Sequence, residues 1–152
     1  HIASSGRLGD DAVNCALTTL RRFRGIADVL NVSILKVIAT AAVRDAEDGK
    51  SFIKEAEKVC RVPVQILTGE EEARISAQGV MMGVPDADGI AADLGGGSVE
   101  LVDIKQGKIR KTVTLPLGGL RLIDMTGGAI AQAAVFWNMR RMRSLEVAEP
   151  AG

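Results

Sequence analysis

The sequence is poor in the residues that most often build nucleophilic, disulfide-bonded or metal-binding sites. Its single histidine is His1, at the terminus, which argues against a Ser-His-Asp or a Cys-His mechanism. Its two cysteines, Cys15 and Cys60, lie in helix-like segments and show no CxxC spacing. The cysteine pattern argues against a disulfide framework or a cysteine-bound metal, and it fits a reducing compartment.

An excess of charge of one sign and long apolar runs are also missing. The 19 basic and 19 acidic residues give a formal net charge of zero, so no overall field directs the chain to DNA or to an acidic membrane. No apolar run approaches the roughly 20 residues that a membrane span needs, and no signal peptide is recognisable. We therefore expect a cytoplasmic protein that neither binds DNA nor inserts into a membrane.

The residues that are present suit a globular α/β protein. Hydrophobic residues make up 47% of the 152 residues, which suffices for the core of one ordinary domain or of pieces of two. Helical spacing of apolar residues predicts helices over 10–30, 51–59 and 70–83, with Met81 and Met82 as core residues. Short apolar runs rich in β-branched residues predict buried strands near 34–43 and 62–69.

The pattern changes at the turn-forming stretch 84–89, which is the expected domain boundary. Three consecutive strands are predicted beyond it, over 90–94, 99–104 and 109–115, followed by a short helix over 120–125. The sequence KQGK at 105–108 is a favourable hairpin turn between the second and third strands. The tail from residue 129 to residue 152 has no clear assignment.

The stretch IAADLGGGSVEL, residues 90–101, places three glycines between two strands. Without Cβ atoms, the N–H groups of Gly95, Gly96 and Gly97 can approach an anion closely, and the Ser98 hydroxyl adds a donor. Asp93 is placed to bind a hydrated Mg²⁺ that bridges to phosphate, and Glu100 lies on the same face of its strand as Ser98. The alternative is that the glycines only satisfy the geometry of a tight turn.

Two further charged residues have more than one interpretation. Three glutamates, at positions 70 to 72, begin the predicted helix, where acidic residues compensate the helix dipole. Glu72 is equally suited to orient or deprotonate a water if it faces a cleft. Arg44 is suited to bind phosphate, but the residues alone favour an ion pair with Asp45 or Glu47.

Four stretches, in the same order along the chain, resemble the exopolyphosphatase/guanosine-pentaphosphate phosphohydrolase (Ppx/GppA) family of the actin-like superfamily. They are VIATAAVRDAEDG (37–49), ILTGEEEARISAQGV (66–80), DLGGGSVEL (93–101) and LPLGGLRL (115–122). The resemblance implies an α/β, actin-like (ribonuclease H-like) two-lobed fold with mixed sheets flanked by helices, of which this chain holds a part. It implies that residues 1–85 end the first lobe and that residues 86–128 begin the second.

The resemblance also implies the activity and the roles of the site residues. It assigns Glu72 as the general base, Arg44 as a phosphate ligand, and Gly95, Gly96, Gly97 and Ser98 as a loop around phosphate oxygens. Asp93 and Glu100 correspond to acidic residues of the site, which we expect to bind Mg²⁺. The implied reaction releases orthophosphate from the end of polyphosphate or from pppGpp. A non-catalytic phosphate- or nucleotide-binding module, or an inactive truncated relative, is the alternative. An actin-like kinase is disfavoured, because such kinases usually use an aspartate base.

The sequence also departs from the pattern of the family. It contains no stretch of the Asp-x-Gly-Ser-Asn-Ser type, which forms the first phosphate loop of the family's N-terminal half. We therefore expect a central fragment of a longer enzyme, unstable or inactive alone. A homodimer would form through regions absent from this chain.

Overall fold

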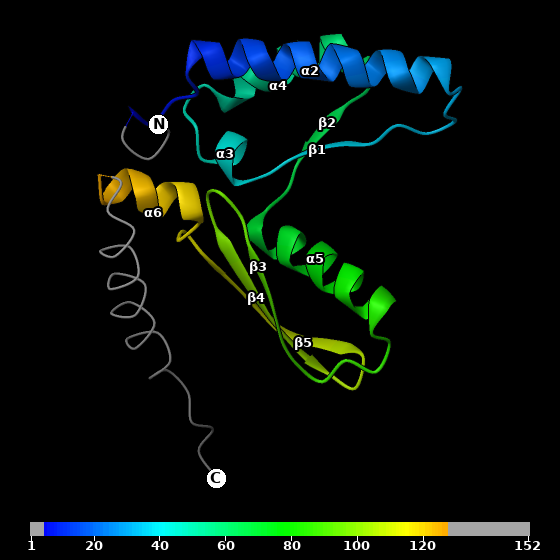
Figure 1. Cartoon of the computed structure of the whole chain (residues 1–152), viewed down its shortest axis with the longest axis vertical. Helices are drawn as coiled ribbons and strands as arrows, with labels where there is room; N and C mark the ends of the chain where they lie inside the picture. The colour runs from blue at the N-terminus through cyan, green and yellow to red at the C-terminus, as the bar shows by residue number, and fades with distance from the viewer. Residues whose placement is uncertain (1–4, 128–152) are drawn as a thin grey trace.

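The computed structural model describes residues 5–127, which form two groups of helices and strands (Figure 1). The first group comprises α2 (Asp10–Val29), β1 (Val37–Ala39), α3 (Ala41–Arg44), α4 (Gly49–Cys60) and β2 (Val64–Ile66). The second group comprises α5 (Gly69–Gly83), β3 (Gly89–Leu94), β4 (Val99–Lys105), β5 (Lys108–Leu115) and α6 (Gly119–Met125).

The strands of the first group form a small parallel sheet. β1 pairs with β2, with Val37 opposite Val64 and Ala39 opposite Ile66. Parallel neighbours need a crossover connection, and α3 and α4 supply it here. α2 packs against α4 and covers this group from outside (Figure 1).

The strands of the second group form an antiparallel meander in the order β3-β4-β5. The turn between β4 and β5 is the one predicted from KQGK: Gln106 and Gly107 have φ angles of 50° and 66°. Positive φ at both central residues is the geometry that matches the twist of a two-residue hairpin. The three predicted strands and their hairpin are therefore confirmed.

α5 packs against the face of this meander, where the main core cluster lies. Ala73 and Ala77 of the helix meet Val102 and Ile104 of β4, and all four are almost fully buried. Side chains alternate along a strand, so the register that buries Val102 and Ile104 also turns Glu100 toward α5. The core thereby places a carboxylate at the end of an otherwise apolar stripe.

Three details differ from the sequence-based expectations. The strands expected near 34–43 and 62–69 are confined to Val37–Ala39 and Val64–Ile66, and Arg44 ends a helical turn, α3. Met82 is 87% exposed, so its expected core position is wrong, whereas Met81 packs against the core. Met81 follows Ala77 by one helical turn and shares its face, while the next residue is rotated about 100° away.

Two expectations about the organisation of the chain are not tested by the structure. The tail 129–152 lies outside the described residues. The division between residues 85 and 86 stays a prediction, and α5, which precedes it, packs on the sheet that follows it. Within residues 5–127 the structure has no helix with the length and apolar character needed to cross a membrane.

The core between α5 and β4 predicts a large difference between two substitutions. We expect Ile104→Ala to lower the free energy of unfolding by about 2–5 kcal/mol, because Ile104 is only 2% exposed and the substitution leaves a cavity. Met82→Ala is the control and should change it by less than about 0.5 kcal/mol. Urea denaturation of both variants measures the two effects, and equal losses would contradict this description of the core.

Candidate active site

The glycine loop, residues 95–98, closes the hairpin between β3 and β4. The Gly95 N–H donates to the carbonyl oxygen of Ser98 at 2.9 Å. The N–H groups of Gly96, Gly97 and Ser98 have no acceptor within residues 5–127. None of the three glycines has a positive φ angle, so turn geometry does not require them. The tight-turn alternative therefore does not account for this sequence.

Close packing accounts for two of the glycines. A Cβ at Gly97 would lie 2.9 Å from the Cβ of Ala41 in α3, and one at Gly96 would lie 3.1 Å from Leu120 of α6. From α6, the Gly119 N–H donates to the carbonyl of Gly95, and the Arg121 N–H donates to that of Gly96. The loop is thus held between the beginnings of α3 and α6.

The residue before α6, Gly118, must itself lack a side chain because it lies against the backbone of the loop. A Cβ on Gly118 would lie 2.4 Å from backbone atoms of Gly96 and Gly97. Two backbone segments therefore meet with no room for a side chain between them. This contact fixes the position of the loop and leaves its unpaired N–H groups in place.

Arg44, at the end of α3, reaches α5 and brings two predicted site residues together. Its Nη1 donates to the carbonyl of Leu67 at 3.0 Å and to Oε2 of Glu72 at 3.2 Å. Its Nε lies 3.4 Å from Oδ1 of Asp45, so the local ion pair expected from the sequence is also present. The same guanidinium therefore takes part in both interactions.

The three glutamates of α5 have separate surroundings. Glu71 forms a capping box with Thr68, and Glu70 pairs with Arg74 one turn along the helix. Glu72 is turned inward, with only 17% of its side chain exposed, toward Arg44. The structure thus gives Glu70 and Glu71 local structural roles and leaves Glu72 at the interior.

A second arginine extends this line of charges. Nη1 of Arg121 in α6 lies 3.0 Å from Oδ2 of Asp45, whose other oxygen faces Arg44. The charges of Arg121, Asp45, Arg44 and Glu72 therefore alternate in sign from α6 through α3 to α5. Nothing in the sequence singles out Arg121, because the partner that places it here is 76 residues away.

Glu100 is 1% exposed, and its Oε1 has no hydrogen-bond partner within the described residues. Burial raises the pKa of this carboxyl, and the nearby carboxylates of Glu72 and Asp93 raise it further. The Ser98 hydroxyl and, more weakly, the charge of Arg44 lower the same pKa. Residues assigned to one site from the sequence are therefore close enough to influence one another.

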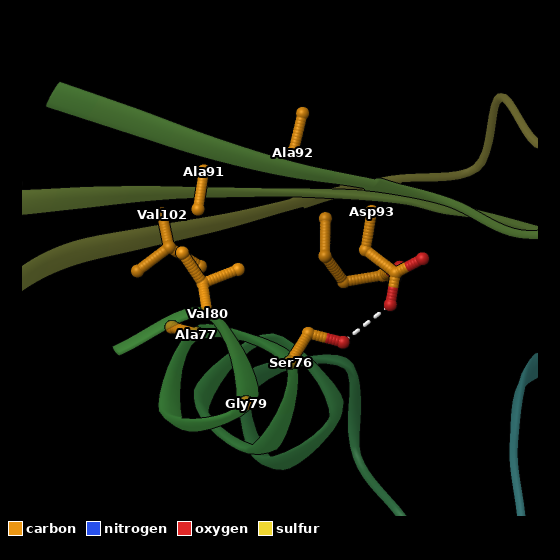
Figure 2. A pocket seen from close by; sticks show the side chains of 9 residues that line it. Ser76, Ala77, Gly79, Val80, Ala91, Ala92, Asp93 and Val102 are labelled. Carbon is orange, nitrogen blue, oxygen red and sulfur yellow. Dashed lines mark hydrogen bonds between the residues drawn. The ribbon is translucent and has the colours of Figure 1, made fainter. Parts of the chain in front are cut away.

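Asp93 lies directly opposite Glu100 in the β3–β4 register. Residues so paired have Cβ atoms about 4.5–5.5 Å apart, and two like charges there repel each other. Both carboxylates line a pocket of about 350 Å³ between α5 and the sheet, together with Ser76, whose hydroxyl donates to Asp93 (Figure 2). Repulsion in such a pair favours a proton or a cation between them.

The donor set fits one divalent cation bound in part by substrate. Residues 5–127 contain no group of three or more His, Cys, Asp or Glu arranged for a metal. Mg²⁺, however, commonly binds through one or two carboxylates, several waters and phosphate oxygens. Asp93 and Glu100, with the unpartnered oxygen of Glu100, meet that requirement.

The fold, with a glycine-loop hairpin and carboxylates facing a helix, defines part of an actin-like α/β protein, and the predicted fold class is confirmed. The chain belongs to the Ppx/GppA phosphatase family, which it matches over residues 1–132. It is 33% identical to an exopolyphosphatase from Cytophaga hutchinsonii (TM-score 0.76), covering 80% of this chain and 40% of that one. It is 25% identical to the Aquifex aeolicus PPX-GPPA enzyme (TM-score 0.72), covering 98% and 52%.

The chain covers only part of the length of its solved relatives. A third solved structure, of an exopolyphosphatase-like protein, is 29% identical (TM-score 0.77) and is matched over 82% of this chain and 41% of its own. The chain therefore spans about half the length, or less, of these solved relatives. An activity like that of the complete relatives is therefore a proposal for this chain.

The adjacent glycines 118 and 119 provide a matched pair for testing the loop contact. We expect Gly118→Ala to lower the free energy of unfolding by about 1–3 kcal/mol, because its Cβ would overlap the glycine loop. Gly119→Ala should not lower it, since the added Cβ would meet no atom within 4 Å other than those of its own and adjacent residues and of its own helix backbone. Thermal denaturation measures both, and a Gly118→Ala chain as stable as Gly119→Ala would contradict the close approach.

The raised pKa of Glu100 predicts a pH dependence of stability. The stability that this group contributes is fully present below its unfolded-state pKa, about 4.3, and is lost as pH rises through the higher folded-state pKa. We therefore expect Glu100→Gln to be more stable than the wild-type chain at about pH 8, by an amount that shrinks toward about pH 4. Urea denaturation across this range, without divalent cations, measures the difference.

A control separates this effect from the general influence of charge. Glu55→Gln removes an exposed carboxylate that pairs with the exposed Lys58. It should produce no comparable trend with pH. A stability difference for Glu100→Gln that is constant over the same range would show that the buried carboxyl is not the cause.

Proposed function

We propose that this chain carries part of a phosphoanhydride hydrolase that releases orthophosphate from the end of polyphosphate or the 5′ phosphate of pppGpp. The observation that supports this most is the placement of Glu72. Its carboxylate is turned to the interior beside Arg44, and it influences the ionisation of Glu100. The glycine loop contacts α3, the helix that ends at Arg44.

Binding of the terminal phosphoryl group would use donors that the folded chain leaves available. The N–H groups of Gly96, Gly97 and Ser98 are free of intramolecular acceptors within the described residues and can point at phosphate oxygens. Arg44 adds a positive charge beside Glu72. Because phosphoryl transfer needs positioning and neutralisation of charge more than covalent chemistry, these donors supply a large part of what it requires.

Glu72 would orient the attacking water and accept its proton. The water oxygen forms a bond to the terminal phosphorus as the anhydride P–O bond breaks in line with it. The shortened phosphate chain leaves with the electron pair of the broken bond. Arg44 would hold the carboxylate of Glu72 in place through the hydrogen bond from Nη1.

Asp93 and Glu100 are the residues that would bind Mg²⁺. When bound, the cation supplies positive charge to phosphate oxygens. The two carboxylates oppose each other across β3 and β4, which offers the ion two ligands from a rigid sheet. The sheet itself is fixed by the core beneath α5.

Polyphosphate is placed first among the substrates because one similar structure is of an exopolyphosphatase. The guanosine substrate ends in the same phosphoanhydride and would engage the same groups. The cytoplasmic location expected from the sequence stays a prediction, as does a homodimer formed outside this chain.

Two glutamates of the same helical turn test the assignment of the base. In the full-length protein that contains this chain, we expect Glu72→Gln to lower kcat for orthophosphate release by about 10²–10⁴-fold, because general base catalysis contributes about that much. Glu70→Gln removes an exposed carboxylate paired with Arg74 and should leave kcat close to that of the wild-type chain. Release of orthophosphate from polyphosphate and from pppGpp, with Mg²⁺ present, provides the measurement.

The same assay decides between the proposal and its alternative. Equal activity of Glu72→Gln and the wild-type chain would remove Glu72 from its role. Phosphate binding by a full-length protein that releases no orthophosphate would favour the non-catalytic binding module.

A further inference from the structure

Ser76 lies one helical turn beyond Glu72 and therefore on the same side of α5. Its hydroxyl donates a hydrogen bond to Oδ2 of Asp93 across the gap between helix and sheet (Figure 2). The two residues are 17 positions apart in the chain, and no sequence pattern indicates that they are in contact. This side-chain hydrogen bond links α5 directly to β3.

The hydrogen bond from Ser76 restrains the carboxylate of Asp93, which another carboxyl group repels. Asp93 is exposed, and it lies opposite the buried carboxyl of Glu100. Without a donor, repulsion between the two groups would favour rotamers that turn Asp93 toward solvent. The bond from Ser76 occupies one oxygen of Asp93, and the other has no partner within residues 5–127.

We infer that Ser76 is a positioning residue that holds Asp93 opposite Glu100, so that the two carboxylates are arranged in advance for a divalent cation. This inference rests on the proposed function, since it concerns the same pair of ligands. Hydrogen bonds to ligating carboxylates commonly tune a metal site, and their loss typically weakens metal binding about 10–100-fold. α5 would then carry the proposed base, Glu72, on one turn and the positioning residue of the cation site, Ser76, on the next.

A pair of isosteric variants isolates the hydroxyl of Ser76. Ser76→Thr keeps the donor and Ser76→Val replaces it with a methyl group, while both add the same bulk. Binding of Mn²⁺, used as a spectroscopic substitute for Mg²⁺, is measured by electron paramagnetic resonance on the full chain without substrate. We expect the valine variant to bind Mn²⁺ at least about tenfold more weakly than the threonine variant.

Two further variants separate positioning from stability. Gln78→Ala, on an exposed position of the same helix, should bind Mn²⁺ as the wild-type chain does. In an Asp93→Asn background, Ser76→Ala should cause no additional loss, because the partner through which it acts is already changed. Thermal denaturation of each variant shows whether a change in binding follows a change in folding.

The outcomes distinguish the inference from the function on which it rests. If the wild-type chain binds Mn²⁺ and the valine and threonine variants bind it equally, the inference is wrong and the proposed metal site stands. If the wild-type chain binds no Mn²⁺ either alone or with inorganic phosphate added, the metal site and the inference are both wrong. A loss confined to Ser76→Val and Ser76→Ala, at unchanged melting temperature, supports the positioning role.

Discussion

The packing of α5 onto β4 is the contact on which the site depends. Two alanines of the helix, both fully buried, allow the helix to approach Val102 and Ile104 closely. The helix repeats every 3.6 residues and the strand every two, so this contact fixes the phase of both elements. Glu72 and Ser76 are thereby brought to the side that faces Asp93 and Glu100. The apolar core between α5 and β4 therefore determines where these carboxylates lie, although the carboxylates repel one another.

The glycine loop shows how a packing requirement and a binding surface coincide. Gly97 and Gly118 are needed because backbone meets backbone or Cβ at these points, and neither has a positive φ angle. Side chains are therefore excluded by neighbouring elements on two sides of the loop. The same exclusion leaves N–H groups accessible to an anion. A mutation that fills this space would disturb the fold and the binding surface together.

Local patterns predicted the elements better than they predicted the site. Alternation, the KQGK turn and apolar periodicity were sufficient for β3, β4, β5 and most of α5, because those signals arise from neighbouring residues. Met82 was misassigned because it is rotated about 100° around the helix from Met81, away from the face of α5 that packs on the sheet. Arg44 and Glu72 are 28 residues apart in the sequence, and Asp45 and Arg121 are 76 apart. Local patterns therefore cannot reveal these pairs, which only the fold brings together. The residues alone could not separate Glu72 from Glu70 and Glu71, and that distinction came from the resemblance.

The surface around α2 and β1 implies that the two halves of the described chain differ in resistance to local opening. Large apolar side chains such as Phe23, Ile34 and Ile38 remain more than half exposed there and line a groove of about 450 Å³, whereas the α5–β4 core is closed. Amide hydrogens of the first half should then exchange with solvent through low-energy openings that leave the meander intact. Such an opening would withdraw Arg44 from Glu72 while Asp93 and Glu100 kept their register. We therefore expect the charge network to open together with the first half, before the meander does.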